Sequence, residues 1–158
     1  MPRRIKLDKI DKKILQNLQM NGRMTNVDLA KEAGISAPPC LRRVRALEDS
    51  GIIKSYHAYL DPSSLGFGIT VFAQVKLVSQ AEQDLKKFED QCNAWDEVRE
   101  CHMLSGETDF LLRVVARDWE GYQEFLTNEL TAAENVTSVK TMPLFRTSKF
   151  APGVPISD

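Results

Sequence analysis

The first 51 residues contain three segments whose apolar residues recur at intervals of three and four. The apolar positions are Leu7, Ile10, Ile14, Leu15 and Leu18 in the first segment, Val27, Leu29, Ala30 and Ala33 in the second, and Leu41, Val44 and Leu47 in the third. This spacing places each set on one side of a helix. The pattern therefore predicts a small domain of three helices over residues 1–51.

Short polar residues and glycine mark the ends of these helices. Thr25 or Asn26 is suited to cap the second helix and Ser36 the third, because such side chains accept hydrogen bonds from the N–H groups of a first helical turn. Gly34 ends the second helix, since glycine readily adopts the left-handed conformation that follows a helix. Residues 33–36 thus join two helices, which predicts a helix-turn-helix.

The spacing of apolar residues changes after residue 51. Ile52–Leu60 is rich in β-branched and aromatic residues, which predicts a strand. Asp61–Ser64 has the composition of a turn. We therefore expect a wing or linker strand over residues 52–64, with the domain boundary inside it.

Residues 65–150 alternate between strand and helix periods in the order β-α-β-β-α-β. The predicted strands are Ile69–Leu77, Val98–Leu104, Phe110–Ala116 and Val136–Leu144, and the predicted helices carry Leu85, Phe88 and Cys92 and the segment 119–130. This order is the ferredoxin-like arrangement. The predicted fold class is α+β, a helix-turn-helix domain followed by a ferredoxin-like βαββαβ domain. Residues 151–158, with two prolines and a glycine, predict a loose tail.

The net charge also differs between the two predicted domains. Residues 1–60 contain 12 Lys and Arg against 6 Asp and Glu, a net charge of +6, whereas residues 61–158 contain 9 against 16, a net charge of −7. The whole chain is therefore close to neutral, at −1. A basic first part is typical of a domain that binds a polyanion.

The third helix is the candidate for entry into the major groove of DNA. Arginines on its non-core positions are suited to guanine edges and to phosphates. The candidate DNA contacts are Arg3, Arg4, Lys6, Thr25, Asn26, Ser36, Ala37, Pro38, Arg42, Arg43, Arg45 and Lys54. The competing interpretation is a three-helix core with a solvated basic face.

The strands of the second domain are apolar on both sides. Phe110, Leu112 and Val114 alternate with Leu111 and Val115. Because both helices of a split βαβ fold cover one face, the other face needs a second layer. A second copy of the chain related by two-fold symmetry would supply it. The alternative is that the N-terminal domain covers this face within one chain.

The predicted turn Gly106–Asp109 is short and polar between two apolar strands. Its N–H groups are suited to a carboxylate, and Asp109 is suited to an ammonium group, so the turn fits the two charged ends of an amino acid. Glycine, threonine and aspartate are also common hairpin residues. From these residues alone, an ordinary hairpin is the favoured interpretation.

Several classes of protein are not expected. The longest apolar runs fall far short of a membrane span, and Arg3-Arg4 is followed by charged residues rather than by the apolar stretch of a signal peptide. Three scattered cysteines favour a reducing compartment over a disulfide framework. Cys101 and His102 point to opposite faces of a strand, so no metal site is expected. No catalytic motif is present, and we expect a protein that is not an enzyme.

Three blocks of the sequence resemble the Lrp/AsnC family of leucine-responsive, or feast/famine, regulators. They are Leu7–Leu15, the stretch from Gly34 to Ile53, and Glu100–Leu112, in the order and spacing of the family between about residue 7 and about residue 150. The resemblance implies a transcription regulator with a winged helix-turn-helix and a ferredoxin-like effector domain. It also implies dimers through the sheet faces, assembly into octamers or similar rings, and a small amino acid, leucine or another, as effector rather than a cofactor.

Carried over by position, the resemblance implies an effector site around the Gly106–Asp109 turn. The residues so implied are Met103, Leu104, Ser105, Gly106, Glu107, Thr108, Asp109, Trp119, Met142, Pro143 and Leu144. Thr108 stands where many members have an aromatic residue, so the identity of the amino acid stays open. The leading hypothesis is a sequence-specific, cytoplasmic and nucleoid-associated regulator of double-stranded DNA. The alternative is an architectural protein that wraps DNA with weak specificity and no effector.

Overall fold

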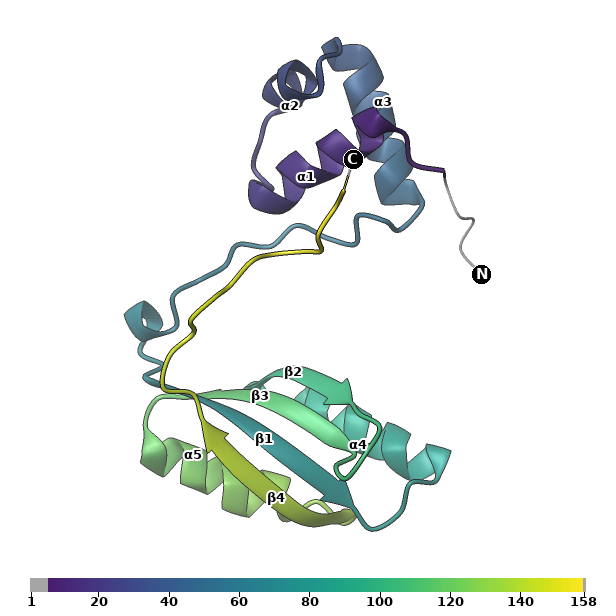
Figure 1. Ribbon diagram of the computed structural model, residues 1–158. Coiled ribbons are helices and arrows are strands. Elements are labelled where there is room, and N and C mark those ends of the chain that lie inside the picture. The colour runs from purple at the N-terminus through teal and green to yellow at the C-terminus, as the bar shows by residue number, and fades with distance from the viewer. Residues whose placement is uncertain (1–5, 158) are drawn as a thin grey trace. The chain divides into compact units, whose positions relative to one another are not determined.

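The computed structural model describes residues 6–157, which fold as two units (Figure 1). Unit 1 comprises Met1–Tyr59 and Lys149–Asp158, and unit 2 comprises Leu60–Ser148. The chain therefore leaves unit 1 at Tyr59 and returns to it at Lys149. Within the described part of the chain, no helix has the length and hydropathy that a membrane crossing requires.

Unit 1 contains the three predicted helices, α1 (Lys9–Met20), α2 (Asn26–Ala33) and α3 (Ala37–Asp49). Asp8 caps α1 in a reciprocal arrangement: its carboxylate accepts the Asp11 N–H at 2.8 Å, and the Asp11 carboxylate accepts the Asp8 N–H at 3.1 Å. Thr25 caps α2 by accepting the Asp28 N–H. Gly34 ends α2 at φ +73°, in the left-handed region that favours glycine.

One apolar core joins these helices. Its buried residues are Ile14, Leu29, Ala30, Ala33, Cys40 and Leu47. They lie on the stripes that the sequence pattern predicted for α1, α2 and α3, with Cys40 added from the first turn of α3. The tight connection at Gly34 is thereby fixed against a shared core, and α2 and α3 form a helix-turn-helix.

The predicted strand at Ile52–Leu60 is wrong. No residue from 52 to 60 belongs to a strand. The N–H groups of Ile52 and Ile53 both donate to the Leu47 carbonyl at the end of α3, at 3.1 and 3.2 Å. The β-rich composition gives an extended segment, but a strand also needs a partner for its backbone, and here the first two donors close the helix instead.

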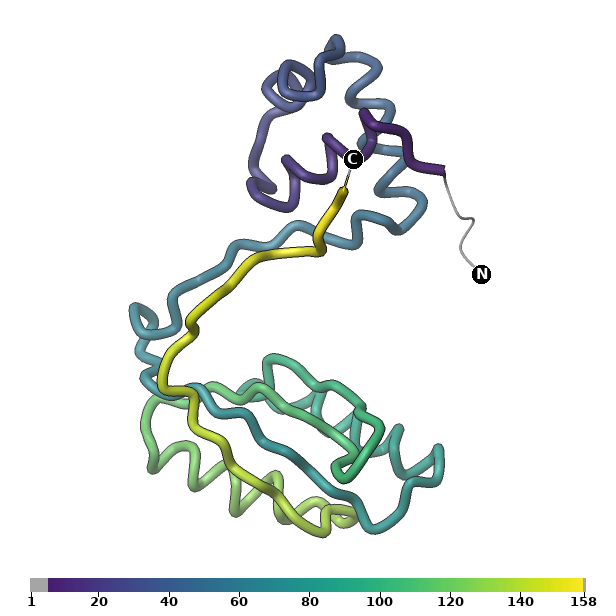
Figure 2. The backbone as a smooth tube through the Cα atoms, viewed as in Figure 1, coloured from purple at the N-terminus to yellow at the C-terminus, as the bar shows by residue number. Residues whose placement is uncertain are grey.

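The predicted loose tail at residues 151–158 also differs from the structure. Val154 and Ile156 bind side chains of α1, and Ile156 is half-buried. The composition of the segment excludes regular secondary structure, but it does not exclude docking onto a neighbouring surface. Figure 2 shows this last part of the chain as the yellow end of the tube.

Unit 2 contains a four-stranded antiparallel sheet with strand order β2-β3-β1-β4. A short 3-10 turn, η1 (Ser63–Leu65), precedes the sheet. The elements that follow are β1 (Ile69–Leu77), α4 (Glu82–Ala94), β2 (Val98–Met103), β3 (Phe110–Ala116), α5 (Trp119–Phe125), the π-helical turn η2 (Leu126–Leu130) and β4 (Val136–Pro143). The order of elements confirms the predicted βαββαβ fold.

Both helices of unit 2 lie on one face of the sheet (Figure 1). The core between helices and sheet includes Val71, Ala73, Val75, Phe88, Phe110, Leu112 and Tyr122, all nearly inaccessible to solvent. The strand residues between these positions, including Phe72, Leu111 and Met142, point to the other face. Within unit 2, that face carries no helix, and besides these apolar residues it presents the polar side chains Gln74, Glu100, His102, Arg113 and Lys140.

Candidate functional site

One face of α3 presents arginines to solvent. Pro38, Leu41, Arg42 and Arg45 are exposed and recur at intervals of three and four residues, so they lie on the same side of the helix. Cys40 and Leu47 lie on the opposite side, in the core. The exposed side therefore offers two guanidinium groups with an apolar residue beside them. The sequence singled out the arginines but not Leu41, because its spacing matches the core stripe.

Arg43 points away from this face. Its guanidinium contacts the Asp8 carboxylate at 2.8 Å and the Asp11 carboxylate at 2.6 Å, and its side chain is 31% exposed. The hydrogen bonds that Arg43 donates to Asp11 and Asp8 raise the pKa of Arg43. The pKa of Asp8 is lowered, mainly by the Asp11 N–H that it accepts and further by Arg43. Arg43 thus ties α3 to the N-terminus of α1, a role that sequence spacing did not reveal.

The other candidate DNA contacts differ in their exposure and in the hydrogen bonds that their side chains already make. Thr25 is exposed but its hydroxyl is engaged with Asp28, and the Asn26 amide donates to the Ala37 carbonyl at 2.9 Å. Ser36 is exposed and makes no capping bond to α3. Lys6 and Lys54 are exposed, and Arg3 and Arg4 lie outside the described residues.

The second candidate site is the loop between β2 and β3. Ser105, Gly106 and Glu107 are exposed, and so are Met103 and Leu104 at the end of β2. Gly106 has φ +137°, a conformation that residues with a side chain rarely adopt. The loop therefore presents its backbone and short polar side chains to solvent at one end of the sheet.

Asp109 fastens this loop to the neighbouring strand. It is only 7% exposed. One carboxylate oxygen accepts the Leu77 N–H at 2.7 Å, and the other accepts the Gln80 side-chain amide at 2.8 Å. The structure thus engages both oxygens with donors of the chain itself. Gln80 had no signal in the sequence, because it lies 29 residues away and only the fold brings it to Asp109.

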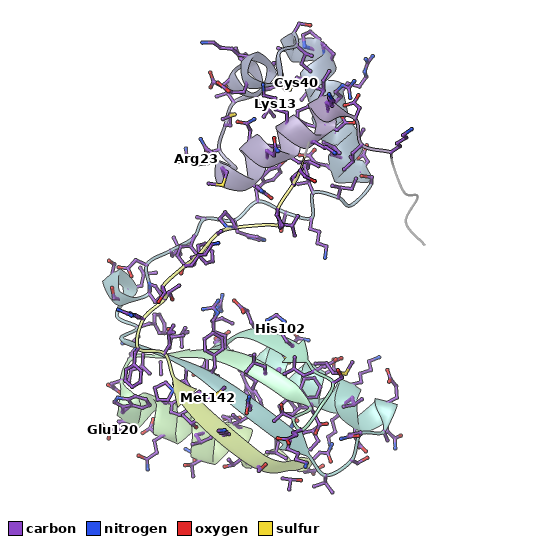
Figure 3. All side chains as sticks on the ribbon, viewed as in Figure 1. Lys13, Arg23, Cys40, His102, Glu120 and Met142 are labelled. Carbon is purple, nitrogen blue, oxygen red and sulfur yellow. The ribbon has the colours of Figure 1, made fainter. Side chains whose placement is uncertain are left out.

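The remaining candidate effector residues lie away from this loop, Trp119 beyond the opposite end of the sheet and Met142 about midway along it. Trp119 follows the end of β3, and Met142 pairs with Phe72 near the start of β1 (Figure 3). The loop that contains Asp109 instead meets the end of β1, where the Asp109 N–H donates to the Val75 carbonyl. The seven residues of β3 put roughly 20 Å between this loop and the end of β3 that leads to Trp119, whereas Met142 is level with Arg113, midway along β3. Within one chain, Trp119 is therefore too far from the loop to line the same pocket.

Neither site has the ligand set of a metal centre. In residues 6–157, no group of three His, Cys, Asp or Glu side chains is placed to hold a metal ion. His102 instead lies beside Glu100, which also accepts the Arg113 side chain at 2.6 Å. Hydrogen bonds from Arg113 and His102 outweigh partial burial and lower the pKa of Glu100.

Comparison with known proteins matches the two units to two kinds of domain. Residues 7–54 match a winged helix-turn-helix DNA-binding domain, and residues 70–154 match the Lrp/AsnC ligand binding domain. The chain is 51% identical over 148 residues to a leucine-responsive regulatory protein of Rhizobium meliloti, covering 94% of this chain and 95% of that protein. It is 42% identical to a Bkd operon transcriptional regulator of Pseudomonas aeruginosa, with 85% and 88% covered.

Solved structures give the same result. A transcriptional regulator of Neisseria meningitidis in complex with L-Met aligns with a TM-score of 0.90 at 37% identity, over 95% of this chain and 97% of that one. An AsnC family transcriptional regulator of Agrobacterium tumefaciens aligns with a TM-score of 0.87 at 33% identity, over 94% and 97%.

Proposed function

The chain belongs to the Lrp/AsnC family of DNA-binding transcriptional regulators, and from that premise we propose that α3 binds a specific operator and that unit 2 binds an amino acid. It is a regulator with a ligand-binding domain, and not an enzyme, since its relatives are named as transcriptional regulators. The exposed arginine face of α3 is the observation that carries the operator proposal. A cytoplasmic, nucleoid-associated location accompanies that function.

The effector proposal rests on the loop between β2 and β3 and on the relative that was solved with L-Met. Ser105, Gly106 and Glu107 are exposed residues, and their backbone N–H groups are suited to an α-carboxylate. The effector is therefore a free amino acid, and no cofactor is required. Because the loop and Trp119 lie beyond opposite ends of β3, a pocket that uses both needs a second copy of the chain.

The uncovered face of the sheet, where apolar and polar side chains are mixed, supports assembly of such copies. Phe72, Leu111 and Met142 lie on the face of unit 2 that α4 and α5 leave uncovered. A homodimer through this face, assembled further into octamers or similar rings, buries the face and presents two copies of α3. Two recognition helices suit a palindromic operator.

One test of the dimer is substitution on that face. We expect the wild-type chain to have at least twice the mass of one chain in light scattering, and Leu111→Glu to shift it toward the monomer, because the buried charge is costly. Thr127→Glu, on the exposed surface of η2, is the matched control and should leave the mass unchanged. A wild-type monomer at micromolar concentration would contradict the proposal.

Specificity for DNA separates the regulator from the architectural alternative. We expect operator DNA to bind at least ~10³-fold more tightly than random DNA at fixed salt. An amino acid at about 100 times its dissociation constant should stabilise the chain by about 2.7 kcal/mol, so a thermal-shift screen of the twenty amino acids should identify the effector. A ratio near one together with no stabilising amino acid would favour the architectural protein.

A further inference from the structure

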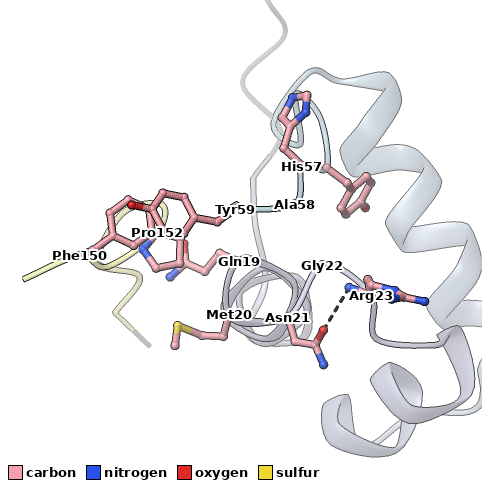
Figure 4. Close-up of a pocket in the computed structure, with 11 residues that line it drawn as sticks. Gln19, Met20, Asn21, Gly22, Arg23, His57, Ala58, Tyr59, Phe150 and Pro152 are labelled. Atoms are coloured by element: carbon pink, nitrogen blue, oxygen red, sulfur yellow. Dashed lines mark hydrogen bonds between the residues drawn. The ribbon is translucent and has the colours of Figure 1, made fainter. Parts of the chain in front are cut away.

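Unit 1 has an apolar groove beside α1 that the end of the chain occupies. The groove is lined by Leu15, Leu18 and Gln19 of α1, by residues 52–57 and by the tail from Pro152 to Ile156, around a cavity of about 630 Å³. A second cavity of about 550 Å³ continues along the same helix to Met20, Tyr59 and Phe150 (Figure 4). The tail is therefore one wall of both cavities.

Hydrogen bonds hold the backbone of the tail to α1. The Gln19 side-chain amide donates to the Val154 carbonyl at 3.0 Å and accepts the Val154 N–H at 3.2 Å. The Gln16 side chain donates to the Ile156 carbonyl at 2.9 Å. Residues three apart on a helix share one side, and residues two apart on an extended chain share one direction, so the two glutamines match the tail in register. Val154 as a whole is 65% exposed, and its backbone makes the two hydrogen bonds to Gln19.

Two further features fit the tail to this position. The rings of Tyr59 and Phe150 stack at a centroid distance of 4.4 Å, where the tail enters unit 1. Gly153 has φ +72°, and a Cβ atom there would lie 2.2 Å from the Gln19 side-chain oxygen. A residue with a side chain at position 153 would therefore meet both backbone strain and the amide that binds Val154.

The helix that binds the tail also holds the recognition helix. Gln16 and Gln19 lie toward the end of α1, whereas Asp8 and Asp11 at its beginning bind Arg43 of α3. An α-helix transmits a displacement at one end to the other because its backbone is bonded throughout. Contact with the tail and the position of α3 are thus connected through α1.

We propose that this groove is a binding site for the chain's own C-terminal segment, Phe150–Ile156, and that occupation of the groove strengthens operator binding by fixing α1 beneath α3. The operator half of this proposal rests on the proposed function. Six residues, 144–149, join β4 to this segment, so the chain connects unit 2 to unit 1 at both of its ends.

Hydrogen exchange of the full-length chain tests the docking. We expect the Val154 amide, which donates to Gln19, to exchange more slowly in the wild type than in Gly153→Ala or Gln19→Ala, in which it should approach the rate of a free peptide. Gly66→Ala is the matched control, because Gly66 also has a positive φ, of +81°, but nothing lies within 4 Å of its added Cβ. Free-peptide exchange of the Val154 amide in the wild type would overturn the proposal.

Titration of the same variants with operator DNA tests whether the docked tail strengthens operator binding. We expect release of the tail to cost operator binding as much as one hydrogen bond of ordinary strength, about fivefold in affinity. Gly153→Ala and Gln19→Ala, the latter removing both bonds to Val154, should therefore each bind operator about fivefold more weakly than Gly66→Ala. If the tail is released but the affinity for operator DNA is unchanged, the claim that the docked tail strengthens operator binding is wrong. A wild-type chain without specific DNA binding would overturn both the proposed function and the claim that the docked tail strengthens operator binding. The hydrogen-exchange experiment would still decide whether the tail docks onto α1.

Discussion

Asp109→Ala is expected to lower the free energy of unfolding of unit 2 by about 2–4 kcal/mol, because it leaves the buried Leu77 N–H and the Gln80 amide without their charged acceptor. For a domain of this size the loss corresponds to a fall in Tm of roughly 10–20 °C. Denaturant or thermal unfolding without any ligand measures it. Glu107→Ala, an exposed acid in the same loop, is the matched control and should change the stability little.

Asp109→Asn separates the structural role of this residue from direct contact with an ammonium group. The amide keeps one acceptor but turns an N–H₂ group toward one of the two existing donors, so the ligand-free chain should already be destabilised. We expect calorimetric titration of Asp109→Asn to show a lower affinity for the amino acid, because the loop that binds it is less ordered. Unchanged stability combined with lost affinity would instead assign Asp109 to the ammonium group.

Replacing Arg42 and Arg45 together by alanine is expected to weaken operator binding by about 2–4 kcal/mol, or roughly 30- to 700-fold. Both side chains lie on the exposed face of α3 and neither has a partner in an ion pair of the described residues. The melting temperature should change little. Gel-shift titrations at fixed salt measure the affinity, and an affinity within twofold of the wild type would remove α3 from the interface.

Arg43→Ala is the matched control for this pair, because it removes an arginine from the same helix but from a different side. Its loss should lower the stability of unit 1 by separating α3 from Asp8 and Asp11. Since the folded-state pKa of Asp8 is lowered, the contribution of this ion pair is present above the ordinary pKa of the carboxyl and is lost as the pH falls. A stable Arg43→Ala chain with the same operator defect as the double variant would contradict the distinction.

The periodicity and the helix caps determined the elements of both units. Apolar stripes such as Ile14 and Leu47 became buried helix faces, and the alternation of Val71, Ala73 and Val75 became the inner face of a strand. These predictions succeeded because burial of one face is a local pattern that the period of the chain records. Charge likewise separated the basic helical part from the acidic part.

Tertiary structure alone decided what the candidate residues contact. Arg43 and Arg45 are alike in sequence, but only the packing of α1 against α3 places two carboxylates beside Arg43. The length of β3 likewise separates the Asp109 loop from Trp119, and the groove on α1 holds a tail whose composition predicted no contact. In each case the partner lies tens of residues away, and a pattern along the chain carries no record of which distant group folding brings within bonding distance.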